Sequence, residues 1–392
     1  METWKRNLFI CCLTSFIISV GMSQLAPMLP LYIASMGVND MAEVERWSGI
    51  VFGSTFLSMA IFSPIWGRLA DKYGRKPMTL RATTSLGTVM IGMGLAQSVY
   101  QLVALRFFQG ALSGFQAAII PLIAQGTPTD RSGWAMGMFF TAQVSGTLLG
   151  PVLGGWMSEV MGFRTMFFCM AGFCYTGVFA LTFIKEEFHP QPQALTLTLK
   201  ETIAKLPHPK LVLGLAITTF LLQFSIMSIE PIITVYIAEI TQHAEHVAMI
   251  AGLVFSCSGF ASMLTASRIG KLGDKIGSEK ILFGSLLLGA CSFIPQGFVT
   301  SPWQLGMMRF LLGVSVAGLM PSVNNLIRRN TPTVCLGRIY GVNQAAQFLG
   351  MFSGAYAGGT IAATLGIRNL FLITAALLFI NAYWCKMAIC KK

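Results

Sequence analysis

The chain has 392 residues, of which 54% are hydrophobic and only 11% are charged, and its formal net charge is +12. A soluble protein carries about 25% charged residues, so this chain has too little charge to cover a water-exposed surface. It also has too much apolar material to stay disordered in water. The positive charge alone would allow nucleic acid or an anionic membrane as a partner. The mean hydropathy of +0.67 favours the membrane and predicts an integral membrane protein that binds no nucleic acid.

Long apolar runs divide the sequence into two sets. A helix needs about 20 apolar residues to cross a bilayer, and the chain offers six such runs on each side of one polar stretch. The predicted fold is all-α, with an N-terminal six-helix bundle over 1–184, a linker over 185–210 and a C-terminal six-helix bundle over 211–392. The twelve runs lie near 8–36, 47–69, 78–97, 101–125, 133–157, 164–184, 211–238, 247–269, 281–299, 302–327, 338–362 and 368–387.

Lysine and arginine gather in alternate loops between these runs. Membrane proteins keep an excess of both residues in their cytoplasmic loops. If the N-terminus is inside, the only basic loop residues left outside are Arg46, Arg164 and Arg368. We therefore expect both termini to be cytoplasmic, with the protein in the inner membrane of a bacterium.

The two sets of runs repeat each other. The segment 67–74 recurs as 270–277, an offset of 203, and Arg106 recurs as Arg309 at the same offset. Hydrophobic composition alone would not align charged residues and glycines along the chain. Two parallel repeats imply a central cavity that is exposed alternately on either side of the membrane, so the repeat predicts a transporter. An offset of 204 joins Gln143 to Gln347, Gly146 to Gly350, Gly150 to Gly354, Gly154 to Gly358 and Gly155 to Gly359.

The loop over 67–76, Gly-Arg-Leu-Ala-Asp-Lys-Tyr-Gly-Arg-Lys, resembles the signature loop of the major facilitator superfamily, and the resemblance covers essentially the whole chain. It implies that Asp71, Arg75 and Asp130 form a network that locks a gate. Asp71 would lie near the N-terminus of a helix in the other half, where the helix dipole favours a carboxylate. The alternative is a basic loop that only sets orientation. Ser278 replaces the arginine in the second copy, so we expect an asymmetric network. The other gate-loop candidates are Gly67, Gly74, Gly270 and Asp274.

The segment 146–155 in the fifth predicted helix is similar to the signature of superfamily exporters that work as antiporters. Glycines four residues apart line one helix face and allow close packing, and a proline in their midst removes a backbone hydrogen bond and bends the helix. The resemblance implies export. The alternative is ordinary packing of small residues, as in the second copy, where Ala355 replaces the proline. The motif residues are Gly146, Gly150, Pro151, Gly154 and Gly155.

Arg106 lies in the segment 102–110, which is similar to the fourth-helix arginine motif of proton-linked superfamily members. An arginine inside a membrane helix is costly and usually functional. The alternative is that Arg106 snorkels to the outer surface, because it lies only about two turns from the helix end. For Arg309 in the tenth helix, we expect snorkelling or a structural role.

Glu230 is the only acidic residue in the interior of a predicted helix, directly before Pro231. Burial disfavours the charged form of a carboxyl group, so Glu230 could load and release a proton. It could also attract a cationic substrate that competes with the proton. The alternative is a solvated glutamate at the outer mouth. The superfamily often has an acidic residue in the first or fourth helix instead, and Ala26 occupies the repeat-equivalent position here. We predict Glu230 and Arg106 as the coupling residues.

The chain has 29 phenylalanines and 23 methionines. Flexible thioethers and aromatic faces can repack around unrelated apolar molecules, although lipid contact accounts for most of these residues. We expect the substrate cavity to include amides from several helices and some aromatic residues that precede Glu230. The cavity candidates are Gln24, Gln143, Phe220, Gln223, Phe224, Met227, Asn324 and Gln347.

Together these features predict a proton-coupled exporter of lipophilic compounds, cations among them, that works by rocker-switch antiport. Its partners would be small lipophilic substrates, protons and the lipid bilayer, and the protein would be a monomer. A narrow exporter of a tetracycline-like drug or a sugar is the first alternative, and a non-transporting membrane receptor or scaffold is the second.

An enzyme is the least supported class. The nine cysteines form no CxxC pair, the four histidines fall in polar connecting segments, and no nucleotide-binding glycine loop is present. We expect no metal and no cofactor, so the transmembrane proton gradient would supply the energy.

Overall fold

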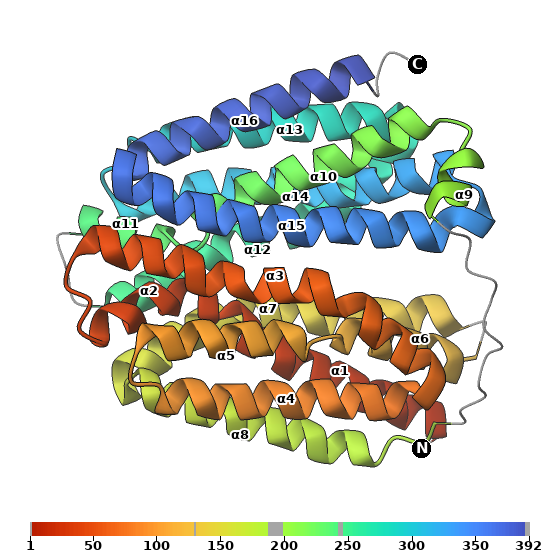
Figure 1. The fold of residues 1–392 in the computed structure, drawn as a ribbon, viewed down its shortest axis with the longest axis horizontal. Helices are drawn as coiled ribbons and strands as arrows, with labels where there is room; N and C mark the ends of the chain where they lie inside the picture. Colours follow the sequence, from red (N-terminus) through yellow and green to blue (C-terminus); the bar gives the residue numbers. More distant parts are fainter. Residues whose placement is uncertain (1, 129–130, 187–198, 242–245, 389–392) are drawn as a thin grey trace.

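A computed structural model describes residues 2–128, 131–186, 199–241 and 246–388 of the chain, and its regular elements are all helices (Figure 1). The first half contains α1 (Thr3–Ser23), α2 (Leu25–Ser35), α3 (Met41–Tyr73), α4 (Arg75–Leu95), α5 (Val99–Ala111), α6 (Phe115–Gly126), α7 (Ser132–Met161) and α8 (Phe163–Thr182). The short helix α9 (Leu199–Ala204) precedes the second half. That half contains α10 (Pro209–Ile229), α11 (Ile233–Ile240), α12 (Val247–Ile276), α13 (Ser278–Gln296), α14 (Pro302–Asn330), α15 (Thr333–Leu365) and α16 (Ile367–Ala388).

Three of the expected spans are interrupted. Pro27 has no N–H to donate to the carbonyl of Ser23, and α1 ends at that serine. The break between α10 and α11 lies around Pro231. Gly114 separates α5 from α6 with a φ of +117°, a conformation that glycine adopts at little cost. The interrupted spans are those expected near 8–36, 101–125 and 211–238.

The two halves lie as two layers, α1–α8 below and α10–α16 above in Figure 1. Equivalent helices make equivalent contacts. In the first half α1 packs on α7, α3 on α5 and α4 on α8, whereas in the second half α10 packs on α15, α12 on α14 and α13 on α16. Between the halves, α3 packs on α15 and α7 packs on α12. We call these two contacts the α3–α15 seam and the α7–α12 seam.

Each seam helix is joined to the next helix by a single glycine. Gly74, Gly162, Gly277 and Gly366 connect α3 to α4, α7 to α8, α12 to α13 and α15 to α16, with φ between +79° and +98°. A side chain with a Cβ rarely adopts this conformation. The four hairpins therefore turn within one residue.

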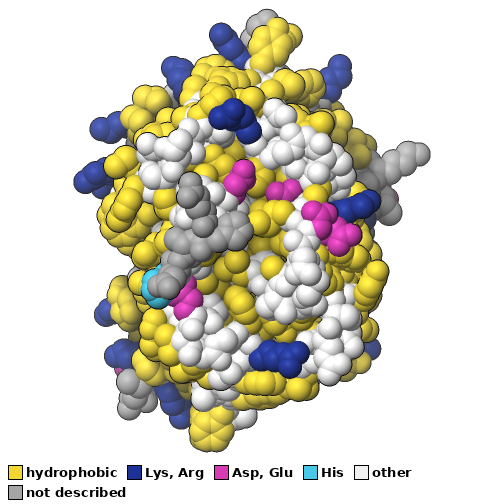
Figure 2. Space-filling view, turned by 90° about the vertical axis from the view of Figure 1, so that its left-hand side faces the viewer, with side chains coloured by type: hydrophobic (Ala, Val, Ile, Leu, Met, Phe, Trp, Pro, Cys, Tyr) yellow, Lys and Arg dark blue, Asp and Glu magenta, His cyan; other side chains and the backbone are white. Residues whose placement is uncertain are grey.

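The helices run between two ends of the bundle. Helix α1 begins and α16 ends at what we call the proximal end, which also carries the turns at 74, 277 and 331–332. The distal end carries the turns at 37–40, 96–98, 162, 297–301 and 366 (Figure 1). Figure 2 faces the distal end, where acidic side chains lie toward the middle and most of the visible lysines and arginines lie toward the rim.

Eleven helices among the described residues are long and apolar enough to cross a membrane. Large hydrophobic side chains such as Trp303, Tyr100 and Phe179 are exposed on them, as expected for surfaces that face lipid. Helix α4 has 21 residues but is less apolar, since it begins with Arg75 and Lys76. The expected total of twelve spans and the orientation of the termini stay predictions.

Candidate substrate and coupling site

Both seams are closely packed near the distal end. A Cβ atom at Gly359 of α15 would lie 2.6 Å from the Glu45 carbonyl oxygen of α3, and one at Gly155 of α7 would lie 2.6 Å from the Ala248 carbonyl oxygen of α12. A Cβ at Gly252 would meet the Pro151 carbonyl oxygen across the α7–α12 seam. Glycine lets backbones approach this closely. The halves are therefore closed against each other at the distal end.

The same four helices part toward the proximal end. At Gly67 of α3, Gly137 of α7, Gly270 of α12 and Gly341 of α15, no atom of a neighbouring element lies within 4 Å of the Cβ position. Helix α3 lies beside α15 at the distal end and diverges from it toward the proximal end (Figure 1). The structure thus represents a state that is closed distally and open proximally.

A carboxylate from one half reaches the other half at the α7–α12 seam. Glu159 of α7 accepts a hydrogen bond from the backbone N–H of Met249 at 2.9 Å, and its other oxygen lies 2.8 Å from Nδ1 of His246. Met249 lies in the first turn of α12, where a negative charge is stabilised by the helix dipole. We call Glu159, His246 and Met249 the distal latch. Sequence reasoning missed it, because histidines in connecting segments were set aside.

The structure brings Glu230 to Arg309. Glu230 directly follows α10, and its Oε2 accepts a hydrogen bond from Nη1 of Arg309 at 3.3 Å. The Arg309 side chain is buried in α14, and its guanidinium lies 5.7 Å from the centre of the Phe255 ring. Nε and Nη2 of Arg309 have no hydrogen-bond partner among the described residues. Arg309 therefore does not snorkel, and it holds the carboxylate that the sequence singled out.

Arg106 occupies the equivalent place in the first half with a different partner. It is 1% exposed, and its Nη1 donates a hydrogen bond to Oε1 of Gln109 at 2.6 Å. Its guanidinium lies 5.3 Å from the centre of the Phe52 ring. Because the side chain is buried, snorkelling does not describe it. Among the described residues, no acidic residue pairs with Arg106 as Glu230 does with Arg309, and Ala26 occupies the position of Glu230 in the repeat.

The glycine ladder of α7 packs on the first helix. Gly146, Gly150 and Gly154 face α1 and the residue after it: a Cβ at Gly150 would lie 2.6 Å from the Val20 carbonyl oxygen, and one at Gly154 would lie 2.6 Å from Cβ of Gln24. Gly155 and Pro151 face the other half instead, in the α7–α12 seam. The predicted antiporter motif thus serves two contacts. The second copy does the same, because Gly350, Gly354 and Gly358 face α10 and Gly359 faces α3.

The gate-loop candidates lie at the proximal end. Gly74 ends α3, and the backbone N–H groups of Arg75 and Lys76 donate to the two carboxylate oxygens of Glu186 at 2.7 and 2.8 Å. Glu186, which the sequence assigned to the linker, therefore caps α4. Asp130 and the side chain of Asp71 lie outside the described residues, so the expected network stays a prediction. In the second copy, Gly270 and Asp274 line a small pocket of about 150 Å³.

Four of the predicted cavity residues lie on α10, in the turns that precede Glu230. The Phe220 and Phe224 rings have centres 6.2 Å apart, and Nε2 of Gln223 lies 3.9 Å from Sδ of Met320. Met227, Gln143 and Gln347 are half-buried. Gln24 is fully buried, and neither of its amide atoms has a hydrogen-bond partner among the described residues. Asn324 is not part of this group, because it is exposed and lies fifteen residues beyond Arg309 on α14, about 22 Å along the axis.

Glu45 is a buried acidic residue that sequence reasoning missed, whereas Glu230 is half-buried. The expected span began near 47, whereas α3 begins at Met41, so Glu45 lies within the helix and is 5% exposed at the α3–α15 seam. The negative charges of Glu239 and Asp40 act on this carboxyl group. The capping Asp40 before Met41, which accepts from the Ala42 N–H, is the signal that could have placed the helix start correctly. In the described part of the chain, no three His, Cys, Asp or Glu residues could hold a metal ion.

Two repeated helical halves that meet at glycine-lined seams, closed at one end and open at the other, are the architecture of a membrane transporter. The family model of the Major Facilitator Superfamily matches residues 11–213 and 215–388, and the chain belongs to this superfamily. It is therefore a transporter and not an enzyme.

The chain is similar over nearly its full length to proteins named multidrug resistance protein MdtG. It is 41% identical to the protein from Serratia proteamaculans over 386 residues, covering 97% of this chain and 94% of the relative. It is 42% identical to that of Escherichia coli K12 / DH10B over 382 residues, again covering 97% and 94%. Among solved structures, the nucleoside transporter NupG has a TM-score of 0.80 at 13% identity, covering 98% of this chain and all of the other. A bacterial homologue of the human lysosomal transporter Spinster, inward-facing and unoccupied, has a TM-score of 0.79 at 12% identity, covering 99% and 97%.

Proposed function

We propose that this protein exports lipophilic compounds, cations among them, across the bacterial inner membrane in exchange for protons that flow inward. The Arg309–Glu230 pair carries the proposal, because it is a carboxylate on a buried arginine at the end of an aromatic strip of α10. The similarity to multidrug resistance proteins supports the substrate class. In the proposed orientation both termini are cytoplasmic, so the proximal opening faces the cytoplasm.

Competition at Glu230 would couple the two flows. A lipophilic cation entering from the proximal side can pack against the faces of Phe220 and Phe224, where cation–π attraction adds to apolar contact. Its charge would then be stabilised by the Glu230 carboxylate. A proton bound at Glu230 removes the negative charge and weakens the hold on the cation and on Arg309. Bound proton and bound cation therefore exclude each other, and no cofactor is required.

Alternating access would complete the cycle. In the proposed outward-facing state, the seams at Gly155 and Gly359 separate, and the proximal ends of α3, α7, α12 and α15 approach each other. The loops at Gly67 and Gly270 would then lie between the halves. Glu230 would take up a proton from outside as the substrate leaves, and it would release that proton inside when the next substrate binds.

A drug-dependent proton flux in proteoliposomes tests the proposal. Purified protein is reconstituted with an imposed pH gradient, and lipophilic cations, neutral compounds and zwitterions are added while the internal pH is recorded. We expect the cations to dissipate the gradient. If none of the compounds changes the internal pH, proton antiport is contradicted. If only one compound class changes it, the protein is a narrow exporter.

Three variants assign the coupling group. Glu230→Gln should abolish the proton flux while tetraphenylphosphonium binding stays measurable. Glu239→Gln, an exposed glutamate on α11, is the matched control and should behave like the unmodified protein. Glu45→Gln tests the buried carboxyl group of α3. Loss of flux in Glu45→Gln with normal flux in Glu230→Gln would refute the assignment to Glu230.

A further inference from the structure

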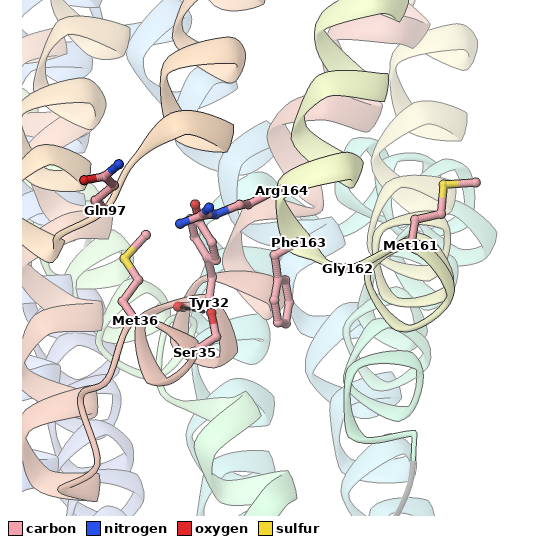
Figure 3. Close-up of a pocket in the computed structure, with 8 residues that line it drawn as sticks. All are labelled: Tyr32, Ser35, Met36, Gln97, Met161, Gly162, Phe163 and Arg164. Carbon is pink, nitrogen blue, oxygen red and sulfur yellow. Dashed lines mark hydrogen bonds between the residues drawn. The ribbon is translucent and has the colours of Figure 1, made fainter.

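A polar pocket opens at the distal end of the first half, away from both seams. It has a volume of about 450 Å³ and is lined by the end of α2, the α4–α5 turn and the α7–α8 turn (Figure 3). The Arg164 side chain lies beside the Tyr32 ring, with Gln97 and Met36 on the opposite wall, whereas Met161 points away from the other residues (Figure 3). The remaining lining residues are Ser35, Gly162 and Phe163.

Among the described residues, Arg164 is the only charged one that lines this pocket. It makes no ion pair with any described residue, and its side chain lies beside the Tyr32 ring (Figure 3). The Tyr32 hydroxyl donates to the Met93 carbonyl oxygen at 2.6 Å, so its oxygen can still accept a hydrogen bond from Arg164. A guanidinium has five N–H donors in a planar fork, so most of them are left for an anion in the pocket.

The repeat-equivalent arginine of the second half contacts a backbone carbonyl and an aromatic ring. Nε of Arg368 donates to the Gly297 carbonyl oxygen at 3.1 Å, and the guanidinium lies 4.6 Å from the centre of the Phe298 ring. The residue at the position of Phe298 in the first half is Leu95. Leu95 offers no aromatic face, and the Arg164 side chain lies beside Tyr32 in the pocket (Figure 3).

The surroundings place the pocket at the level of the membrane surface. Tyr100, three residues after Gln97, packs edge-on against Trp47 at 5.1 Å between ring centres, and such tyrosine and tryptophan residues mark membrane–water interfaces. Leu95 and Phe168 are exposed beside the pocket on α4 and α8. An arginine in a pocket thus adjoins an apolar surface that faces lipid.

We propose that the pocket formed by Arg164, Tyr32 and Gln97 binds the phosphate headgroup of an anionic phospholipid, whose acyl chains lie along Leu95 and Phe168. The Arg164 fork would hold the phosphate oxygens in a charge-assisted contact. The Gln97 side chain lies across the pocket to contact the glycerol oxygens. This assignment does not depend on the direction of transport or on Glu230.

Native mass spectrometry of the purified protein in detergent, titrated with dioleoylphosphatidylglycerol, tests the proposal. We expect saturable binding that Arg164→Gln weakens about tenfold, as for loss of one charged hydrogen-bonded contact. Arg46→Gln removes an exposed charge at the same end and should leave the affinity unchanged. Leu95→Phe keeps Arg164 but restores the aromatic face of the second half, so it should draw the guanidinium away and also weaken binding.

Dioleoylglycerol and inorganic phosphate identify which part of the lipid is recognised. We expect dioleoylglycerol to bind poorly, and millimolar inorganic phosphate not to displace the lipid. Equal binding by the unmodified protein and Arg164→Gln would overturn the proposal, as would equal binding of dioleoylglycerol. Occupancy by inorganic phosphate alone would identify a site for soluble anions instead. Drug-dependent proton flux by Arg164→Gln checks that this variant is folded.

Discussion

The two halves of this transporter place a buried arginine at equivalent positions and give it different partners. Arg309 holds the carboxylate of Glu230 at 3.3 Å, whereas Arg106 holds the neutral amide of Gln109 at 2.6 Å. Both guanidinium groups lie over an aromatic ring of a seam helix, Phe255 or Phe52. The helices and glycine contacts are the same in both halves, whereas a carboxylate partner for the buried arginine is present in the second half only, among the described residues.

The glycine positions, which set the distance between helices, are the same in both halves, whereas the partners of the buried arginines differ. Glycines of both ladders face the same neighbouring helices in each half, because any side chain there would push two backbones apart. The partner of a buried arginine is less constrained, because an amide or a carboxylate can satisfy its N–H groups. Only the carboxylate can also exchange a proton.

Replacing Arg309 or Arg106 by methionine, one at a time, should give the largest difference in proton coupling between the two halves. Removing one partner of a buried ion pair costs about 3–5 kcal/mol, and we expect Arg309→Met to cost near 3 kcal/mol because Glu230 keeps some solvent contact. Coupled transport should fall about hundredfold. Arg106, which the sequence suggested as a coupling residue, has a neutral amide as its partner. We therefore expect Arg106→Met to lower folding stability by about 1–3 kcal/mol and to keep proton coupling. Proton flux and thermal unfolding of both variants measure this contrast, and equal loss of coupling would contradict it.

Side chains at the seam glycines should affect both halves alike. Gly155→Val and Gly359→Val each place a Cβ against a backbone carbonyl of the other half, and such overpacking costs about 1–3 kcal/mol. The distally closed state should lose about 30-fold in population. Spin labels at the exposed, repeat-equivalent Tyr100 and Trp303 would report a longer distance. An unchanged distance in either variant would show that its seam does not control the distal end.

The amide of Gln109 offers a smaller test of the same comparison. Gln109→Leu leaves Arg106 buried without its side-chain partner and should cost about 1–3 kcal/mol of folding stability, with little change in transport. Leu312→Gln, at the equivalent position in α14, would offer Arg309 a second partner and should reduce coupling without loss of stability. Chemical denaturation and proton flux distinguish the two outcomes. A coupling defect in Gln109→Leu would mean that the first half also takes part in proton transfer.

The distal latch should give the smallest effect. Glu159→Gln removes a charge from a partly exposed helix N-terminus, which is worth about 1 kcal/mol. The closed state should therefore lose about fivefold in population, read by the same pair of spin labels. Glu43→Gln, which removes an exposed charge in the first turn of α3 at the same end, is the control and should leave the distance unchanged.

The sequence was sufficient for the features that depend on local pattern. The repeat offsets place Arg106 and Arg309 at equivalent depths, and the apolar runs locate the main helices within a few residues. The family assignment is confirmed by the match over both halves. The helix breaks near Pro27 and Pro231 were not predicted, although each proline lacks the N–H that a continuous helix needs.

The missed contacts join residues that are far apart in the chain. Nothing in the spacing of Arg309 and Glu230 indicates that they meet, and an arginine two turns from a helix end is equally compatible with snorkelling. Glu159 and His246 meet only because the two halves pack at the distal end. Glu45 was not recognised as a helix residue because the helix was expected to begin with its apolar run, whereas it begins at Met41, directly after the capping Asp40.

The single-glycine turns have a mechanical consequence. Gly74, Gly162, Gly277 and Gly366 each tie a seam helix to its neighbour with no spare residue. A seam helix therefore cannot peel away alone, because its hairpin partner is pulled with it. A displacement of a seam helix at its glycine end is therefore passed directly to the next helix. Lengthening one of these turns would add slack between the two helices that it joins without altering any residue of the site.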